Sequence, residues 1–202
     1  AFMQRALRLA QRGYGATSPN PMVGAVIVRK GKIIGEGWHK RAGQAHAEVN
    51  AIHSARRSAK EVRGATIYVT LEPCCTFGRT PPCTAALIES GIARVVVGAK
   101  DPNPKHSGKG LVLLRKAGIK VEAGLLEQEC ARLNEVFNHW ITTQRPFVIC
   151  KSAMSLDGKI ATNSGDSKWI TGEKARAFGM RLRLGADAII AGVNTILRVD
   201  TA

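Results

Sequence analysis

Residues 72–83 read EPCCTFGRTPPC and residues 46–48 read HAE, and these two stretches decide the fold. They place one imidazole, His46, and two thiols, Cys74 and Cys83, around the beginnings of two expected helices. Side chains two residues apart point about 200° apart within a helix, so His46 and Glu48 can share a site only in a first turn, where side chains reach over the end of the axis. A helix N-terminus also favours the thiolate form of cysteine. The pattern predicts one metal site between two helix starts.

That metal site has the composition expected for zinc with an open position. One neutral imidazole and two thiolates balance the charge of Zn²⁺ and leave a fourth tetrahedral position for water, which is typical of a catalytic zinc. Glu48 would take a proton from that water and deliver it to the substrate and its leaving group. The alternative is a closed structural site, for which Cys75 is the only near fourth ligand; adjacent residues rarely bind one tetrahedral ion together.

The spacing also points to a family. H-x-E followed by Pro-Cys and a second cysteine is the signature of zinc deaminases. The chain resembles, over essentially its whole length, the bifunctional deaminase–reductase of riboflavin biosynthesis. Eight residues separate Cys74 from Cys83, whereas transfer-RNA adenosine deaminases and cytidine deaminases have a C-x-x-C spacing. The stretches that carry the resemblance are PNPMVG (19–24), TLEPC (70–74), GRTPPC (78–83), KDPNP (100–104) and SLDG (155–158).

The resemblance implies a cytidine-deaminase-like domain that hydrolyses the exocyclic amine of 2,5-diamino-6-ribosylamino-4(3H)-pyrimidinone 5′-phosphate. It gives the zinc to His46, Cys74 and Cys83 and the proton transfer to Glu48. The implied substrate contacts are Asn20, His39, Arg79, Thr80, Asp101 and Asn103. Among them, Arg79 and Thr80 suit a phosphate. The alternative for Asn20, Asp101 and Asn103 is turn chemistry beside proline, and the alternative for His39 is a surface position.

One departure from the family follows Cys74, where the family often has a small residue and then a histidine. This chain has Cys75-Thr76 there, so if that histidine helps to bind substrate, Thr76 must act differently. Several residues have no motif partner and are expected to be structural, in the core or solvated: His53, His106, His139, Cys130 and Cys150.

Residues 146–202 resemble the start of the family's reductase domain, which has a dihydrofolate-reductase-like α/β fold and uses NADPH. Considered without the resemblance, Trp169 would be a ring in a core or an interface, and Arg183 would lie on a solvated helix face. Where the family usually reads ADDP, residues 198–201 read RVDT, so Val199 cannot supply the expected carboxylate. We therefore expect a fragment of a longer bifunctional enzyme that deaminates but does not oxidise NADPH. The resemblance gives the cofactor to Ala153, Trp169 and Thr195 and the ribosylamino substrate to Ser167 and Arg183, with Lys151 as a further participant.

The hydrophobic pattern predicts an α/β domain of three layers over residues 1–145, with a boundary near residue 145 at Arg145-Pro146. A first expected helix contains residues 7–10 and ends near Gly13, and further helices are expected over residues 46–59, 83–90, 109–117 and 125–141. The expected strands cover residues 22–28, 32–37, 65–71, 94–98 and 120–123. The second domain should contain strands at 147–153 and 186–191, a hairpin in 154–160 around Asp157-Gly158, and a basic helix at 172–184.

The composition excludes other classes of protein. A chain of 202 residues that is 45% hydrophobic can bury a core, and no apolar run approaches the roughly 20 residues of a bilayer span. The net charge of +15 attracts phosphate, but the basic residues are scattered and only 5% of residues are aromatic, so no nucleic-acid partner is expected. Five cysteines without a secretion signal favour the cytoplasm. A homo-oligomer is left open, and a nucleic-acid or nucleotide deaminase and a zinc-stabilised binding module remain alternatives.

Overall fold

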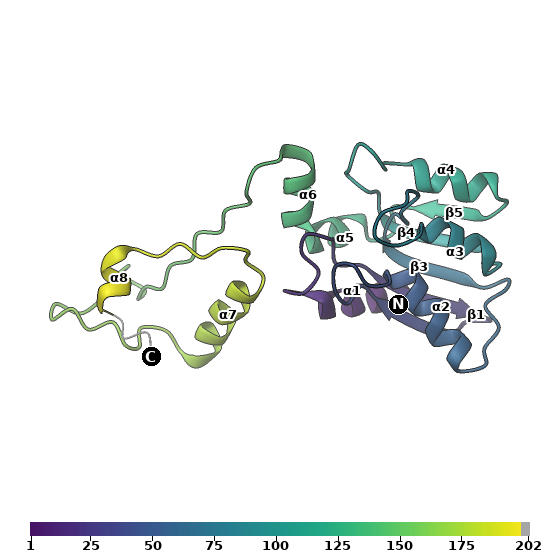
Figure 1. Cartoon of the computed structure of the whole chain (residues 1–202). Helices are drawn as coiled ribbons and strands as arrows, with labels where there is room; N and C mark the ends of the chain where they lie inside the picture. The colour runs from purple at the N-terminus through teal and green to yellow at the C-terminus, as the bar shows by residue number, and fades with distance from the viewer. Residues whose placement is uncertain (199–202) are drawn as a thin grey trace. The chain divides into compact units, whose positions relative to one another are not determined.

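A computed structural model describes residues 1–198. The chain divides into two compact units, Ala1–Phe147 and Val148–Ala202. The first unit contains a five-stranded sheet covered by helices on both faces (Figure 1). Among the described residues, no helix has the length and apolar character needed to cross a bilayer.

The sheet mixes antiparallel and parallel strands in the order β2-β1-β3-β4-β5. β1 pairs with β2 as a hairpin around Lys30-Gly31 and with β3 on its other side, both antiparallel, while β3, β4 and β5 run parallel. The parallel strands are connected through helices, as parallel pairing requires. The strands are β1 (Gly24–Arg29), β2 (Lys32–Trp38), β3 (Thr66–Leu71), β4 (Arg94–Ala99) and β5 (Lys120–Ala123).

Two apolar clusters hold the layers together. One packs the inner faces of α2, α3 and α4 against the sheet and includes Ile67 and Leu87, both fully buried. The other packs α1 and α5 on the opposite face and includes Met3 and Cys130. The expected three-layer domain is therefore confirmed. The helices are α1 (Phe2–Ala10), continued by a 3-10 turn (Gln11–Gly13), α2 (Ala47–Arg57), α3 (Cys83–Glu89), α4 (Lys109–Lys116), α5 (Glu127–Leu133) and α6 (Glu135–Thr143).

A close approach of α2 to the sheet fixes one side of the functional site. Gly37 on β2 faces the first turn of α2, and a Cβ at this position would collide with the carbonyl oxygen of Ala47. The absence of a side chain there lets the helix start, with His46 as its N-cap residue, lie directly on the strand. β3 ends at Leu71 and leads into the loop that carries Cys74.

The prediction of one long helix over residues 125–141 is wrong, because the structure has two helices there, α5 and α6, separated at Asn134. The buried Asn134 side chain accepts a hydrogen bond from the Met22 backbone N–H at 2.8 Å and donates one to the Met22 carbonyl at 2.9 Å. This pairing joins residues 112 positions apart, which local periodicity cannot show. It anchors the residue at which α5 ends and α6 begins.

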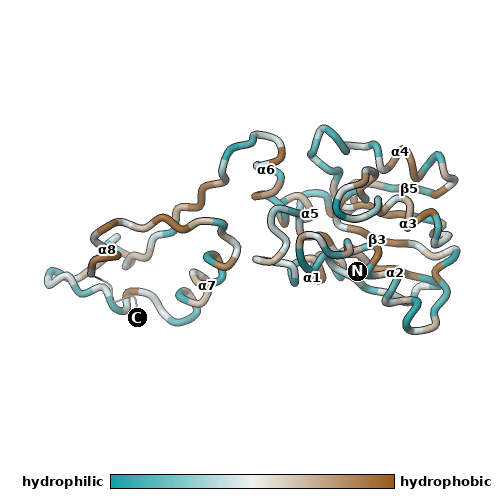
Figure 2. The backbone as a smooth tube through the Cα atoms, in the orientation of Figure 1, coloured by the Kyte–Doolittle hydropathy of each residue, from teal (hydrophilic) through white to brown (hydrophobic). Residues whose placement is uncertain are grey.

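The prediction of strands in the second unit is also wrong for the residues that the structure describes. Residues 147–153 and 186–191 form no strand, although the turn at Asp157-Gly158 does form, with Ser155 N–H donating to the Lys159 carbonyl at 2.9 Å. The apolar side chains of these stretches are exposed, Val148 by 84% and Ile190 by 99%. In Figure 2 the hydrophobic colour runs along the segment that leaves α6 as well as along β3. A strand needs a hydrogen-bonded neighbour, and residues 148–198 contain α7 (Glu173–Leu184) and α8 (Val193–Arg198) but no partner strand.

Candidate active site

Three side chains that the sequence singled out as metal ligands lie together. The ligand atoms of His46, Cys74 and Cys83 all lie within 4.8 Å of one another. His46 Nδ1 is 3.2 Å from the sulfur of Cys83 and 3.5 Å from the sulfur of Cys74. A tetrahedral ion with bonds of about 2.0–2.3 Å holds its ligand atoms about 3.5 Å apart, so these residues fit a zinc ion.

Cys75 does not belong to this group. Among the described residues, the cluster with metal-binding spacing contains His46, Cys74 and Cys83, whereas Cys75 lines a separate groove beside α4. Three protein ligands are typical of an open zinc site and four of a closed one. The geometry favours the open site over the closed alternative.

The start of α3 stabilises negative charge on Cys74. The backbone N–H of Cys83, the first residue of α3, donates to the Cys74 sulfur at 3.3 Å. Hydrogen bonds from the Cys83 thiol and from His46 lower the pKa of Cys74 to about 4. The Cys74 anion and burial raise the pKa of Cys83. The helix N-terminus therefore stabilises a thiolate, as its position suggested, but the thiolate is on the preceding loop.

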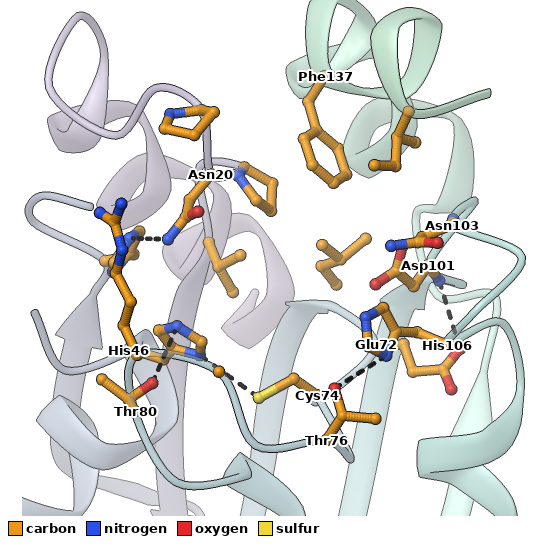
Figure 3. Close-up of a pocket in the computed structure, with 18 of the residues that line it drawn as sticks. Asn20, His46, Glu72, Cys74, Thr76, Thr80, Asp101, Asn103, His106 and Phe137 are labelled. Atoms are coloured by element: carbon orange, nitrogen blue, oxygen red, sulfur yellow. Dashed lines mark hydrogen bonds between the residues drawn. The ribbon is translucent and has the colours of Figure 1, made fainter. Parts of the chain in front are cut away.

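His46 is oriented from both ring nitrogens. Its Nδ1 faces the two sulfurs, and its Nε2 lies 3.5 Å from the hydroxyl oxygen of Thr80. A metal-binding histidine commonly has its second ring nitrogen hydrogen-bonded in this way, which fixes the ring orientation. Thr80, expected from the sequence to contact a phosphate, thus lies against the candidate ligand His46 (Figure 3).

Glu48 is a buried carboxyl group in the wall of the same pocket. Its side chain is 3% exposed, and burial raises its pKa to about 7, with the Cys74 anion adding to the effect. The second position of α2 places it beside His46 at the helix start. A carboxyl group of this pKa can both accept and donate a proton near neutral pH.

The pocket next to the cluster has a volume of about 470 Å³ and contains each first-unit substrate residue expected from the sequence. On one wall, Asn20 Nδ2 lies 3.1 Å from His39 Nε2, and His39 Nδ1 lies 3.3 Å from the Ala45 carbonyl. Because that carbonyl can only accept, Nδ1 carries the proton and Nε2 accepts from Asn20. Burial lowers the pKa of His39, consistent with a neutral ring.

The opposite wall carries Asp101 and Asn103 (Figure 3). The Asp101 carboxylate accepts a hydrogen bond from the Asn103 backbone N–H at 2.8 Å, and the Asn103 side-chain oxygen accepts one from Lys105 N–H at 3.0 Å. The turn chemistry weighed for these residues is therefore present, and both residues also line the pocket. Burial raises the pKa of Asp101. The exposed Arg79 lies at the rim of the pocket.

Sequence reasoning missed several residues of the pocket. His106, expected to be structural or solvated, lines it, and its Nδ1 lies 3.4 Å from the Thr76 hydroxyl oxygen. Thr76 belongs to the Cys75-Thr76 pair at which the chain departs from the family it resembles. Three apolar side chains of α6 also line the pocket, and their spacing of three and four residues could equally have indicated a core face: Phe137, Trp140 and Ile141.

The residues expected to bind NADPH and the ribosyl substrate lie in separate segments of the second unit. Trp169 is 71% exposed and stacks against Arg176, whose guanidinium lies 4.4 Å from the ring centre. Ser167, Arg183 and Thr195 are exposed and Ala153 is half-buried. Arg183 donates a hydrogen bond to Met180 within α7. Cys150, expected in a core, is exposed, and the departure noted at Val199 lies outside the described residues.

A three-layer fold with a histidine and two cysteines at two helix starts and a buried glutamate beside them defines the cytidine-deaminase class of zinc proteins. The family described as "Cytidine and deoxycytidylate deaminase zinc-binding region" matches residues 1–99, and the RibD C-terminal domain matches residues 146–202.

The relatives are more specific. The riboflavin biosynthesis protein RibD of Aquifex aeolicus is 54% identical over 98% of this chain and 55% of its own length, and that of Actinobacillus pleuropneumoniae is 53% identical over 97% and 51%. The crystal structure of a diaminohydroxyphosphoribosylaminopyrimidine deaminase/5-amino-6-(5-phosphoribosylamino)uracil reductase from Thermotoga maritima matches with a TM-score of 0.92 and 51% identity, over 98% of this chain and 56% of that one. The chain belongs to the RibD family and spans about half the length of the curated relatives it matches.

A more distant likeness is to a structure described for tRNA:A34 deaminases. A structure from studies of A-to-I editing by tRNA:A34 deaminases is 32% identical, with a TM-score of 0.50, over 65% of this chain and 97% of that one.

Proposed function

We propose that the first unit hydrolyses the exocyclic amine of 2,5-diamino-6-ribosylamino-4(3H)-pyrimidinone 5′-phosphate, the deamination step of riboflavin biosynthesis. The observation that carries this proposal is the placement of Glu48, buried in the wall of a pocket beside three converging ligand atoms. The likeness to the Thermotoga maritima deaminase/reductase supports the choice of substrate.

In this proposal His46, Cys74 and Cys83 hold zinc, which when bound supplies activation of water at neutral pH. Glu48 accepts one proton from the attacking water and passes it to the ring nitrogen as the C–O bond forms. It then transfers the proton of the newly attached hydroxyl to the amine, so that the C–N bond breaks, ammonia leaves and the carbonyl forms. The burial of Glu48 keeps bulk water from competing for that proton.

The walls of the pocket would bind the rest of the substrate. Asn20 and His39 on one side and Asp101 and Asn103 on the other offer hydrogen bonds to ring edges and ribose hydroxyls. Arg79 at the rim is the cation for the 5′-phosphate, while Thr80 orients His46 and lies near the same rim.

We also propose that the longer protein reduces the ribosyl group with NADPH, using Ala153, Trp169 and Thr195 for the cofactor and Ser167 and Arg183 for the substrate. In the described part of the second unit, these residues lie in segments without a sheet to align them. The 202-residue chain is therefore expected to show no steady NADPH consumption, followed by absorbance.

The proposal is tested by offering the zinc-loaded chain two substrates. Ammonia release from the pyrimidine phosphate is expected, and no inosine is expected in transfer RNA. Inosine formation with no release from the pyrimidine would instead make the chain a nucleic-acid deaminase, the activity named for its tRNA:A34 relatives. Absence of both activities in a zinc-loaded chain would favour a zinc-stabilised binding module.

A further inference from the structure

Glu72 stands in the motif that leads to Cys74, yet neither the metal cluster nor the proton transfer uses it. Its side chain is 4% exposed and lies at the end of β3, in the wall of the pocket. A buried carboxylate is costly unless it is fully hydrogen-bonded. The partners of this carboxylate indicate what it does.

The Glu72 carboxylate accepts hydrogen bonds from three backbone N–H groups of one segment. Its Oε1 accepts from Gly110 at 3.0 Å, and its Oε2 accepts from Gly108 at 2.9 Å and from Asp101 at 3.3 Å. The two ends of the segment, residues 101–110, are therefore tied to a single side chain 29 to 38 residues earlier in the chain.

These bonds also complete the start of α4. The N-cap residue of α4 is Gly108, which has no side chain to accept a hydrogen bond, and the first turn contains no acidic residue. Helix N-termini leave backbone N–H groups unpaired and favour negative charge nearby. Glu72 supplies both the acceptor and the charge from another part of the chain.

The approach of α4 to Glu72 depends on Gly110. A Cβ at this position would collide with the carbonyl oxygen of Pro73 and lie 3.2 Å from Glu72 Oε1 at the nearest approach to that side chain. The helix start is thus held against the loop that carries Cys74.

The tied segment carries one wall of the pocket. Asp101, Asn103 and His106 all belong to this segment and line the pocket. His106 Nδ1 lies 3.4 Å from the hydroxyl oxygen of Thr76, which lies outside the segment (Figure 3). The Asp101 backbone N–H donates to the Glu72 carboxylate, and the Asp101 carboxylate in turn accepts from the Asn103 backbone N–H. The orientation of the wall therefore follows from the Glu72 carboxylate.

We propose that Glu72 is a positioning residue that holds residues 101–110 as the substrate-binding wall, and so sets the affinity for substrate without taking part in proton transfer. Three backbone donors occupy the two oxygens of Glu72, so neither oxygen is left to accept a proton from water. The part of this inference that concerns substrate rests on the proposed deaminase function; the part that concerns the wall does not.

The test compares Glu72→Gln with the wild-type full chain, both loaded with zinc. Glutamine keeps the shape but puts an NH₂ group where one oxygen accepted, so at least one backbone N–H loses its partner. We expect amide hydrogen exchange at Asp101, Gly108 and Gly110 to accelerate about tenfold. We expect KM for the pyrimidine phosphate to rise about tenfold, with kcat within about threefold of wild type and with unchanged zinc content.

Glu89→Gln, an exposed substitution on α3, is the matched control and should change none of these values. Unchanged exchange at the three amides in Glu72→Gln would overturn the proposal, as would a loss of kcat at constant KM. If the wild-type chain does not deaminate the pyrimidine, the proposed function fails, while the exchange measurement still decides the role of Glu72.

If Glu72→Gln does not fold, the wild-type exchange rates decide. Gly108 and Gly110 lie at a helix start, where amides ordinarily exchange fast because they lack intrahelical partners. Protection of both is the expected result, and exchange at the rate of exposed amides overturns the proposal.

Discussion

The pairing of Asn134 with the backbone of Met22 provides a quantitative test of how α6 is placed. Asn134 is 4% exposed and makes two hydrogen bonds to Met22, of 2.8 and 2.9 Å. Asn134→Ala removes both and leaves the N–H and carbonyl of Met22 without these partners. An unsatisfied buried donor or acceptor lowers the free energy of unfolding by about 1–3 kcal/mol. Met22 is half-buried, so the lower end of this range applies to its N–H and to its carbonyl. We expect a loss of about 2–3 kcal/mol in the free energy of unfolding.

Urea unfolding of the full chain, followed by far-UV circular dichroism, measures this loss. Thr142→Ala is the matched control, because its exposed hydroxyl bonds only to carbonyls of its own helix at 2.7 and 3.2 Å. The control should stay within about 0.5 kcal/mol of wild type. A loss in Asn134→Ala no larger than in the control would refute the reasoning that this side chain anchors α6.

Three further results are expected. Thr80→Val should weaken zinc affinity about tenfold or more relative to Thr80→Ser, because only serine keeps a hydroxyl beside His46 Nε2; competition with a chelator measures it. Arg79→Ala should raise KM for the pyrimidine phosphate while leaving KM for the unphosphorylated nucleoside unchanged, and equal effects on both compounds would show that Arg79 does not bind phosphate. The Arg5 hydrogen bond lowers the pKa of Glu36 below its ordinary value, so the stability this pair contributes is present above pH about 4.3 and disappears as the pH falls through the lowered pKa. The melting temperatures of wild type and Glu36→Gln should accordingly differ at pH 7 and converge in acid, and a constant difference would contradict this assignment.

The first unit could be predicted from sequence because its signals are local. The β1–β2 hairpin, the parallel strands and the starts of α2 and α3 follow from hydrophobic period, turn glycines and prolines, and each forms within a few residues of the expected bounds. The spacing of His46, Cys74 and Cys83 likewise predicted which side chains meet.

The remainder depends on contacts between distant residues. The hydrogen bonds of Asn134 to Met22 and of Glu72 to residues 101–110 join positions far apart in the chain, so no local sequence pattern predicts them. His106 enters the pocket through that same tied segment, so its role was not visible from its neighbours. The strands expected beyond residue 146 have the right apolar composition, but composition does not supply a partner strand.

The most direct test of the central claim is ammonia release from the pyrimidine phosphate by the zinc-loaded wild-type chain and by Glu48→Gln, with metal content measured on the same samples. The proposed function predicts about one zinc per chain in both proteins and a rate at least about 100-fold lower in the variant, because proton transfer by a positioned side chain contributes that much. Wild-type ammonia release by Glu48→Gln at equal zinc content would contradict the role given to Glu48 and, with it, the proposed mechanism.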